Sequence, residues 1–360
     1  MYPEPGLTSD PVSDLEIGMD FRLPEYRREV FLRFYDFHLK HKTHPGCVYF
    51  VIPWLAEHFG WGQEETLWFA LLNGHTQNPL TSLILHQQGP SPDDHLAVAS
   101  FYKKNYPRMR VDTDRRHQKP CLAQLMEEYA QRVGGSQEDY WASMDGWDEV
   151  WDAGFSLPHF GRLSAWSFLE YVNIAMPRLN LDPTTMMFGA SGSASHRNGM
   201  AKVLGRDDLY HGKPNPQFDG KYGAPVLDWF EVEADLMLSE AAERAGADYV
   251  GDVRRLTLES ALCTYKSWHK PRRRYPNVYA DMLHDRIKGT EREWPELDFS
   301  VWWDMREDCL PPELRQESNP RDPGLCELKQ NWYLHTGEVV MMDEYPAFAN
   351  GFYGAASPFM

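Results

Sequence analysis

The sequence has few cysteines, no long apolar run and few signs of β-strands. Its five cysteines lie far apart and never at C-x-x-C spacing, which argues against structural zinc and an iron–sulfur cluster. Such scattered cysteines fit reduced thiols in a cytoplasm. No apolar stretch reaches the roughly 18 residues of a membrane helix. The first thirty residues are polar and acidic, so we expect no secretion signal and no membrane association.

Positive charge is also scarce relative to negative charge. The 360 residues include 36 Lys and Arg against 53 Asp and Glu, a formal net charge of −17. This balance argues against a general nucleic-acid binder but permits a local basic groove. Apolar residues make up 42% of the chain, enough for a sizeable core. Because strand patterns are few, the predicted class is mainly α.

Apolar periodicity places the predicted helices and the loops between them. Helices are expected at residues 26–40, 48–59, 64–72, 97–102, 121–133, 227–245, 256–268 and near 278–287. Glycine- and serine-rich loops are expected at 180–199 and 202–225. We predict a flexible lead-in at 1–20, a helical domain of two packed lobes at 21–290, and an irregular C-terminal extension at 291–360 with a small β-hairpin at 332–340.

One nonapeptide at residues 157–165 reads L-P-x-F-G-R-x-S-A. Leu157 and Pro158 bias the chain out of helix, and Gly161 permits a tight turn. Ser164, or the turn before it, is suited to cap a following helix, whose first amide groups then point outward. A helix N-terminus of this kind holds a phosphate oxygen. The alternative is an ordinary connection between two helices.

This stretch resembles the hairpin of the helix-hairpin-helix DNA glycosylases, L-P-G-[VI]-G-x-x-[ST]-A, with His159 in place of the first glycine. Two further elements resemble the same family. Residues 73–78 read N-G-H-T-Q-N at the end of an apolar helix, like the family's DNA-facing Q-Q-T-Q element, and Asp182 follows the hairpin where the family has its pocket aspartate. The resemblance implies a helix-hairpin-helix glycosylase-like helical fold.

The resemblance also implies which residues contact DNA. Leu163 stands where bifunctional glycosylases carry their catalytic lysine, so lyase chemistry through a Schiff base is not expected. The implied DNA-contacting residues are Asn73, Thr76, Gln77, Phe160, Gly161, Arg162 and Ser164.

Most of residues 25–290 is similar to a phage branch of this superfamily, the α-glutamyl/putrescinyl thymine pyrophosphorylases or amino acid:DNA transferases. The similarity lies in residues 26–31, 73–79, the hairpin with Trp166 and Glu170, residues 195–199, and residues 265–281. It implies that pyrophosphate leaves a pyrophosphorylated 5-hydroxymethyluracil in DNA and that an amine, from an amino acid or a polyamine, takes its place. It also places the protein in the cytoplasm of the phage's host.

This reaction requires cations for the leaving group and a base for the amine. The candidate bases are Asp182, Glu170 and His75, although Glu170 also reads as an ion-pair partner and His75 as a polar helix-end residue. The candidate pyrophosphate ligands are Arg197, Lys266, Arg272, Arg273 and Arg274, for which a structural loop arginine and a solvated basic run are the alternatives. The sequence requires no cofactor and shows no metal-ligand set, although pyrophosphate often travels with Mg²⁺.

Two other functions compete with the transferase. In a monofunctional DNA glycosylase, Asp182 would activate water and the arginines would only grip the DNA backbone. A non-catalytic phage protein that binds or mimics DNA would fit the net charge of −17. The amine, the modified base and the oligomeric state are left open.

Overall fold

The computed structural model describes residues 24–43, 47–112, 121–190, 192–210, 223–268, 281–310 and 315, except the side chains of Tyr26, Ser267 and Trp268. Within these ranges the chain forms helices and no strand, which confirms the mainly helical class. No described helix is long and apolar enough to cross a membrane. The predicted lead-in, the β-hairpin at 332–340 and Arg272, Arg273 and Arg274 lie outside the described residues.

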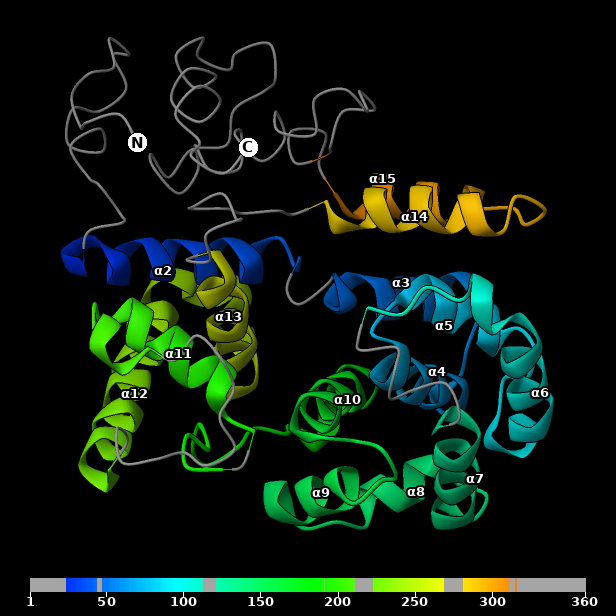
Figure 1. Ribbon diagram of the computed structural model, residues 1–360, viewed down its shortest axis with the longest axis horizontal. Helices are drawn as coiled ribbons and strands as arrows, with labels where there is room; N and C mark the ends of the chain where they lie inside the picture. The colour runs from blue at the N-terminus through cyan, green and yellow to red at the C-terminus, as the bar shows by residue number, and fades with distance from the viewer. Residues whose placement is uncertain are drawn as a thin grey trace, which may run out of the picture. The chain divides into compact units, whose positions relative to one another are not determined.

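The chain divides into two compact units, each built from separate segments (Figure 1). Unit 1 comprises residues 1–45, 185–282 and 307–360, and unit 2 comprises residues 46–184 and 283–306. The helix α14 (Met282–Glu293) continues across the predicted domain boundary at residue 290. Trp294 and Phe299, just beyond that point, are only 4% and 6% exposed and belong to unit 2.

Unit 1 is built around α2 (Pro24–Lys40), α11 (Ala194–Val203), α12 (Ala224–Tyr249) and α13 (Arg255–Trp268). Aromatic side chains fill its core, where Phe31 stacks on Tyr35 at 6.2 Å and meets Tyr265 edge-on at 5.2 Å. Arg28 joins α2 to α12 by ion pairs to Glu233 and Glu240 at 2.7 and 2.6 Å. These contacts explain why helices far apart in the sequence form one unit.

The helix α11 covers residues 194–199 and 202–203, which were predicted to be parts of the loops at 180–199 and 202–225. Gly199, which favoured a loop in the sequence, lies inside α11 where this helix crosses α13. A Cβ atom at this position would lie 2.2 Å from the carbonyl oxygen of Leu262. Glycine is therefore required here for close helix packing, not for a turn.

Unit 2 contains α3 (Val48–Phe59), α4 (Gln63–Thr76), α5 (Pro79–His86), α6 (His95–Asn105), α7 (Cys121–Val133), α8 (Gln137–Ala142), α9 (Gly146–Phe155) and α10 (Arg162–Ala175), with most of α14 and of α15 (Ser300–Cys309). The central helix α4 is buried on every side from Thr66 to Thr76. It extends four residues beyond the predicted end at 72. It meets α10 at Gly74, where a Cβ would lie 2.8 Å from the Cβ of Phe168.

Candidate functional site

The predicted turn between two helices at residues 157–165 is confirmed in outline, since α9 ends at Phe155 and α10 begins at Arg162. The residue with the left-handed backbone is His159, with φ 64°, whereas Gly161 has φ −90° and ψ −179°. The left-handed residue of the tight turn is therefore His159, which occupies the position of the first glycine in the family hairpin. A histidine there costs about 1 kcal/mol of backbone strain, and its Nε2 lies 2.7 Å from Oε1 of Gln124 on α7.

The first turn of α10 begins at a glycine, at the place where the sequence predicts an anion site. The N-cap is Gly161, not Ser164, and a glycine has no side chain with which to cap the helix amides. Gly161 is exposed, and no atom lies within 4 Å of where its Cβ would stand. This open space beside a helix N-terminus suits a phosphate oxygen.

Two predicted DNA-contacting side chains of the hairpin instead anchor it to the unit. Phe160 is 7% exposed and packs edge-on against Phe168, with ring centroids 5.6 Å apart. Arg162 is equally buried, and its guanidinium lies 4.6 Å from the ring centroid of Trp166. These two side chains fix the hairpin to unit 2, and direct DNA contact by Phe160 and Arg162 stays a prediction, as it does for Gly161 and Ser164.

The junction of α4 and α5 forms a buried hydrogen-bond network. Asn73 and Thr76 are fully buried. Thr76 Oγ1 lies 2.6 Å from Ser82 Oγ, which donates to Asn73 Oδ1 at 3.2 Å. Asn78 caps α5 by accepting a hydrogen bond from the amide of Thr81 at 3.2 Å. Both side chains therefore bind protein groups inside the unit, and contact of Asn73 and Thr76 with DNA stays a prediction.

Gln77 is the predicted DNA-contacting residue of this element that reaches the surface. It ends α4 in a left-handed conformation with φ 55°, and its Nε2 donates to the Gly74 carbonyl at 2.9 Å. Tyr171 donates to its Oε1 at 3.4 Å. Arg286, which pairs with Asp112 at 2.8 Å, donates to its backbone carbonyl at 3.4 Å. The network thus holds Gln77 half-exposed beside an ion pair.

His75, a candidate base, lies entirely inside unit 2. Its Nε2 has no hydrogen-bond partner among the described residues. Burial, with a smaller contribution from the charge of His159, lowers the pKa of His75 from 6.5 to about 4. Because a general base works best with a pKa near the working pH, His75 is a weaker candidate for the base than the two carboxylates, and its catalytic role stays a prediction.

This depressed pKa predicts that unit 2 loses stability in acid. The unfolded chain binds a proton at His75 below pH 6.5, whereas the folded protein binds it only near pH 4. The free energy of unfolding should therefore fall as the pH drops through this window, by roughly 3 kcal/mol in total. Urea unfolding between pH 7 and 4 should show a shallower pH dependence in His75→Gln than in the wild type. The exposed His58→Gln is the matched control, and equal slopes in wild type and His75→Gln would contradict the prediction.

The two carboxylates proposed as bases differ in accessibility. Glu170 is fully buried on α10 and accepts a hydrogen bond from the Tyr49 hydroxyl at 2.6 Å. Burial and the charge of Glu170 raise the pKa of the neighbouring Tyr171. Asp182 is half-exposed and follows Leu181, whose amide donates to Asn173 Oδ1 at 2.9 Å. Asp182 is the carboxylate that a substrate reaches more easily.

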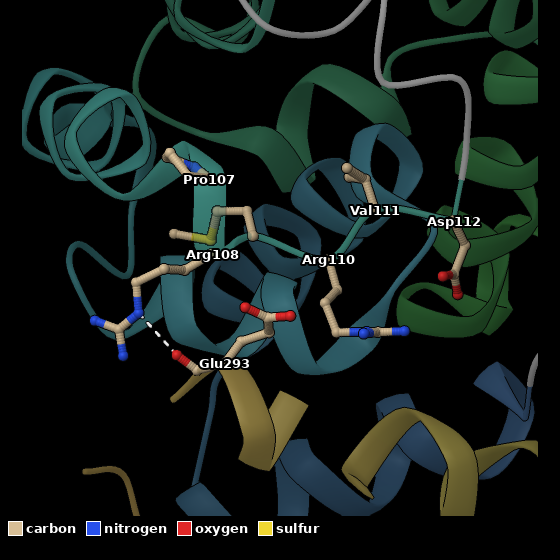
Figure 2. A pocket seen from close by; sticks show the side chains of 7 residues that line it. Pro107, Arg108, Arg110, Val111, Asp112 and Glu293 are labelled. Carbon is tan, nitrogen blue, oxygen red and sulfur yellow. Dashed lines mark hydrogen bonds between the residues drawn. The ribbon is translucent and has the colours of Figure 1, made fainter. Parts of the chain in front are cut away.

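A pocket of unit 2 that is lined by two arginines and two carboxylates was not foreseen as a site (Figure 2). Its volume is about 170 Å³, and residues 107–112 and Glu293 line it. Arg108 stacks on Trp294 at 3.8 Å and donates to the Glu293 carbonyl at 2.8 Å. The Arg110 guanidinium lies against Gly289, where a Cβ would be 2.7 Å from its Cζ, and makes no hydrogen bond or ion pair to a described residue. It therefore has donors available for an anionic ligand.

The candidate pyrophosphate ligands that the structure describes belong to unit 1. Arg197 on α11 is 5% exposed, and Lys266 on α13 donates to Ser195 Oγ. The other described candidates belong to unit 2. The structure thus divides the predicted site residues between the two units.

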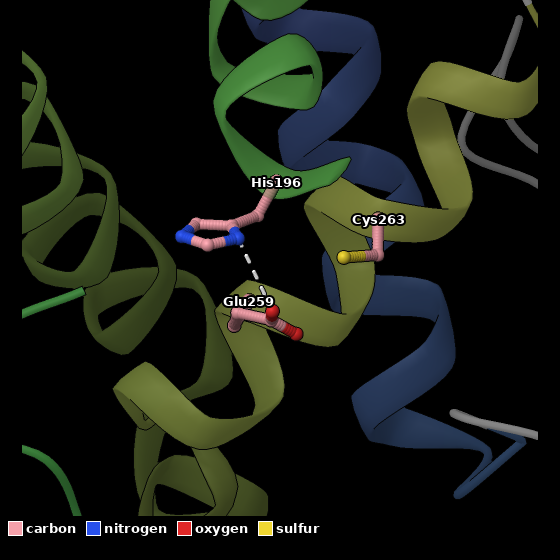
Figure 3. Close-up of side chains that lie close together, drawn as sticks. All are labelled: His196, Glu259 and Cys263. Carbon is pink, nitrogen blue, oxygen red and sulfur yellow. Dashed lines mark ion pairs between the residues drawn. The ribbon is translucent and has the colours of Figure 1, made fainter. Parts of the chain in front are cut away.

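A second group of polar side chains lies between α11 and α13 of unit 1. His196 is fully buried, and its Nδ1 lies 3.2 Å from Oε1 of Glu259 (Figure 3). Cys263 is the third member, and Phe188 stacks on the imidazole at 5.0 Å. Glu259 and Cys263 were not predicted as site residues from the sequence, because each is the single residue of its type on α13. Their spacing of four, which places them on one helix face, was the available signal.

Comparison with known proteins identifies a family and a relative of this chain. Residues 32–275 match the model of a family described as amino acid:DNA transferase. The chain is also 30% identical, over 300 residues, to a protein of Salmonella phage ViI named serinyltransferase, which covers 76% of this chain and 71% of the relative. No solved structure matches, so the helix-hairpin-helix glycosylase-like architecture stays a prediction.

Proposed function

Because the chain belongs to the amino acid:DNA transferase family, whose members are transferases that act on DNA with an amino acid, we propose a specific reaction for it. The substrate is DNA that carries pyrophosphorylated 5-hydroxymethyluracil. The bond between the C5-methylene carbon and the bridging oxygen breaks, and pyrophosphate leaves with that oxygen. A nucleophilic atom of the amino acid bonds to the methylene carbon and gives its proton to a base.

The observation that carries the DNA part of this proposal is the hairpin before α10. Its exposed Gly161 leaves room for a phosphate beside the first amides of the helix. Arg110 in the pocket of unit 2 supplies a cation with available donors for a further backbone phosphate. These local groups let a chain with a net charge of −17 hold DNA.

The chemical step needs a proton acceptor and a cationic clamp. We assign the role of base, which accepts the proton of the nucleophile, to Asp182, because it is the more exposed of the two candidate carboxylates. Glu170, buried against Tyr49, is assigned a supporting role. Arg197, Lys266 and the run Arg272, Arg273 and Arg274 are proposed to meet the charge that builds on the departing pyrophosphate.

The proposed donor is an amino acid, with serine as the first choice. The family description and the name of the phage ViI relative support this choice over a polyamine. Serine carries two nucleophiles, an amine and a hydroxyl. The structure of the product nucleoside distinguishes them, because a hydroxyl-linked product keeps a primary amine that reacts with a primary-amine reagent, whereas an amine-linked product has only a secondary amine.

The test is nucleoside analysis after incubation with modified DNA. Pyrophosphorylated DNA would be incubated with the protein and each amino acid or putrescine in turn, then digested and examined by mass spectrometry. We expect a new nucleoside that carries serine, and none with putrescine. Release of the base from the sugar would instead identify a glycosylase, and an unchanged nucleoside with every donor would favour a non-catalytic DNA-binding protein.

The hairpin can be tested separately through Gly161. In Gly161→Ala the added methyl group meets no protein atom, so the free energy of unfolding should change by less than about 1 kcal/mol. The methyl group does occupy the proposed phosphate site, and we expect DNA affinity to fall about tenfold, or 1.4 kcal/mol. Fluorescence anisotropy with duplex DNA at low salt measures the change.

The matched control is Gly251→Ala in unit 1, where a Cβ also meets no atom within 4 Å. It should bind DNA like the wild type. Equal affinities of Gly161→Ala and Gly251→Ala would remove the hairpin from the DNA contact.

A further inference from the structure

The closest approach of α11 and α13 brings three metal-ligating side chains together. The helices are nearest where Gly199 faces the Leu262 backbone. His196 precedes Gly199 by three residues and Glu259 precedes Leu262 by three, so each lies about one helical turn from the crossing. Cys263 lies four residues after Glu259, on the same face of α13. Figure 3 shows one ring nitrogen of His196 facing the Glu259 carboxylate, and the Cys263 sulfur pointing from α13 toward these two side chains.

The distances suit one ion. The Nδ1 of His196 and Oε1 of Glu259 are 3.2 Å apart, and the ligand atoms of all three residues lie within 4.8 Å of one another. In a tetrahedral site with bonds of about 2.0 to 2.3 Å, neighbouring ligand atoms are roughly 3.3 to 3.8 Å apart. The His–Glu pair is already close to this separation, and the Cys263 sulfur, which lies within 4.8 Å of both, has to move closer when an ion binds.

The surroundings hold the first two ligands in place. The side chains of His196 and Glu259 are 0% and 4% exposed. Phe188 stacks on the imidazole at 5.0 Å, with an interplanar angle of 25°. Since burial deprives ionisable groups of hydration, a site with two such groups is stabilised when a cation binds between them.

The ligand chemistry selects the class of metal. Imidazole, carboxylate and thiolate together favour zinc and chemically similar ions over Mg²⁺ and Ca²⁺, which prefer oxygen ligands alone. Three protein ligands leave the fourth position of a tetrahedral ion for water or substrate. A carboxylate and a thiolate balance the two positive charges of the ion.

We propose that His196, Glu259 and Cys263 form a binding site for one zinc-class divalent ion with an open fourth position. This inference rests on unit 1 alone and does not depend on the proposed function. It revises the sequence-based expectation of no metal site. That expectation missed the site because its ligands come from two helices far apart in the chain.

Cobalt titration of the full-length, tag-free protein tests the site. After treatment with a chelator, Co²⁺ should bind at about one ion per chain and produce the charge-transfer absorption of a cobalt–thiolate bond. Zn²⁺ should then displace Co²⁺ and abolish this absorption. Cys263→Ser should lack the band, and His196→Gln and Glu259→Gln should bind at least about tenfold more weakly. Cys309→Ser, which changes a half-buried cysteine on α15, should keep both the band and the affinity.

Two results would overturn the proposal. One is a wild-type protein that binds neither Co²⁺ nor Zn²⁺ stoichiometrically in equilibrium dialysis. The other is a cobalt–thiolate band that persists in Cys263→Ser. Because the dialysis result uses only wild-type protein, it stands even if a variant does not fold. Thermal unfolding adds a readout independent of colour: the melting temperature of the wild type should rise with Zn²⁺, and that of His196→Gln should rise much less.

Discussion

Replacing Gly199 with alanine should lower the free energy of unfolding of unit 1 by roughly 3 kcal/mol or more. The added methyl carbon would lie 2.2 Å from the carbonyl oxygen of Leu262 and 2.9 Å from its Cα. These are backbone atoms of α13, so no side-chain rotation relieves the contact and the two helices have to separate. That separation also moves His196 away from Glu259. In the wild type, Nδ1 of His196 lies 3.2 Å from Oε1 of Glu259.

Urea unfolding combined with amide hydrogen exchange of α11 and α13 measures this effect. The matched control is Gly251→Ala, also in unit 1, where a Cβ meets no atom within 4 Å. It should leave exchange in α11 and α13 close to that of the wild type. If Gly199→Ala has the same stability as this control, the close crossing of the two helices is wrong.

Replacing each arginine of the run Arg272, Arg273 and Arg274 with alanine should slow pyrophosphate release by about 100-fold at each key position. We propose that these side chains meet negative charge that increases as pyrophosphate leaves, so their loss acts on the chemical step. The measurement is single-turnover release of pyrophosphate from pyrophosphorylated DNA at saturating protein. Saturation separates this loss from weaker DNA binding, which more protein restores.

Arg178→Ala is the matched control for this series. Arg178 is an exposed arginine of unit 2 that pairs with Glu138, and its loss should leave the single-turnover rate unchanged. Unchanged rates in all three arginine variants would remove the run from the active site. The leaving-group clamp would then have to be sought at Arg197 and Lys266.

The helices with clear apolar periodicity were predicted well from the sequence. Residues 121–133 form α7 with the predicted bounds, and α3 also begins and ends as predicted. The helix α11 was missed because Gly199 and its polar neighbours look like a loop when read alone. Only the packing partner, the Leu262 backbone, explains why glycine occupies a helix there.

The candidate site was predicted less completely, for a physical reason. The hairpin at 157–165 was found because its signals are local: a proline, a glycine and the start of an apolar helix. Burial is not local, so the sequence could not show that Asn73, Thr76, Phe160 and Arg162, which were predicted to contact DNA, have buried side chains. The same limit hid the cluster around Glu259, since a spacing of four on one helix gains meaning only when His196 faces it.

The most direct test of the transferase proposal counts the two products of one reaction. DNA with a known content of pyrophosphorylated 5-hydroxymethyluracil would be incubated with the protein and radiolabelled serine. Serine bound to DNA and pyrophosphate in solution would be measured at the same times. The displacement mechanism predicts that both rise at the same rate, one serine for each pyrophosphate, with no base released. Pyrophosphate release without serine incorporation, or release of the base in place of pyrophosphate, would contradict it.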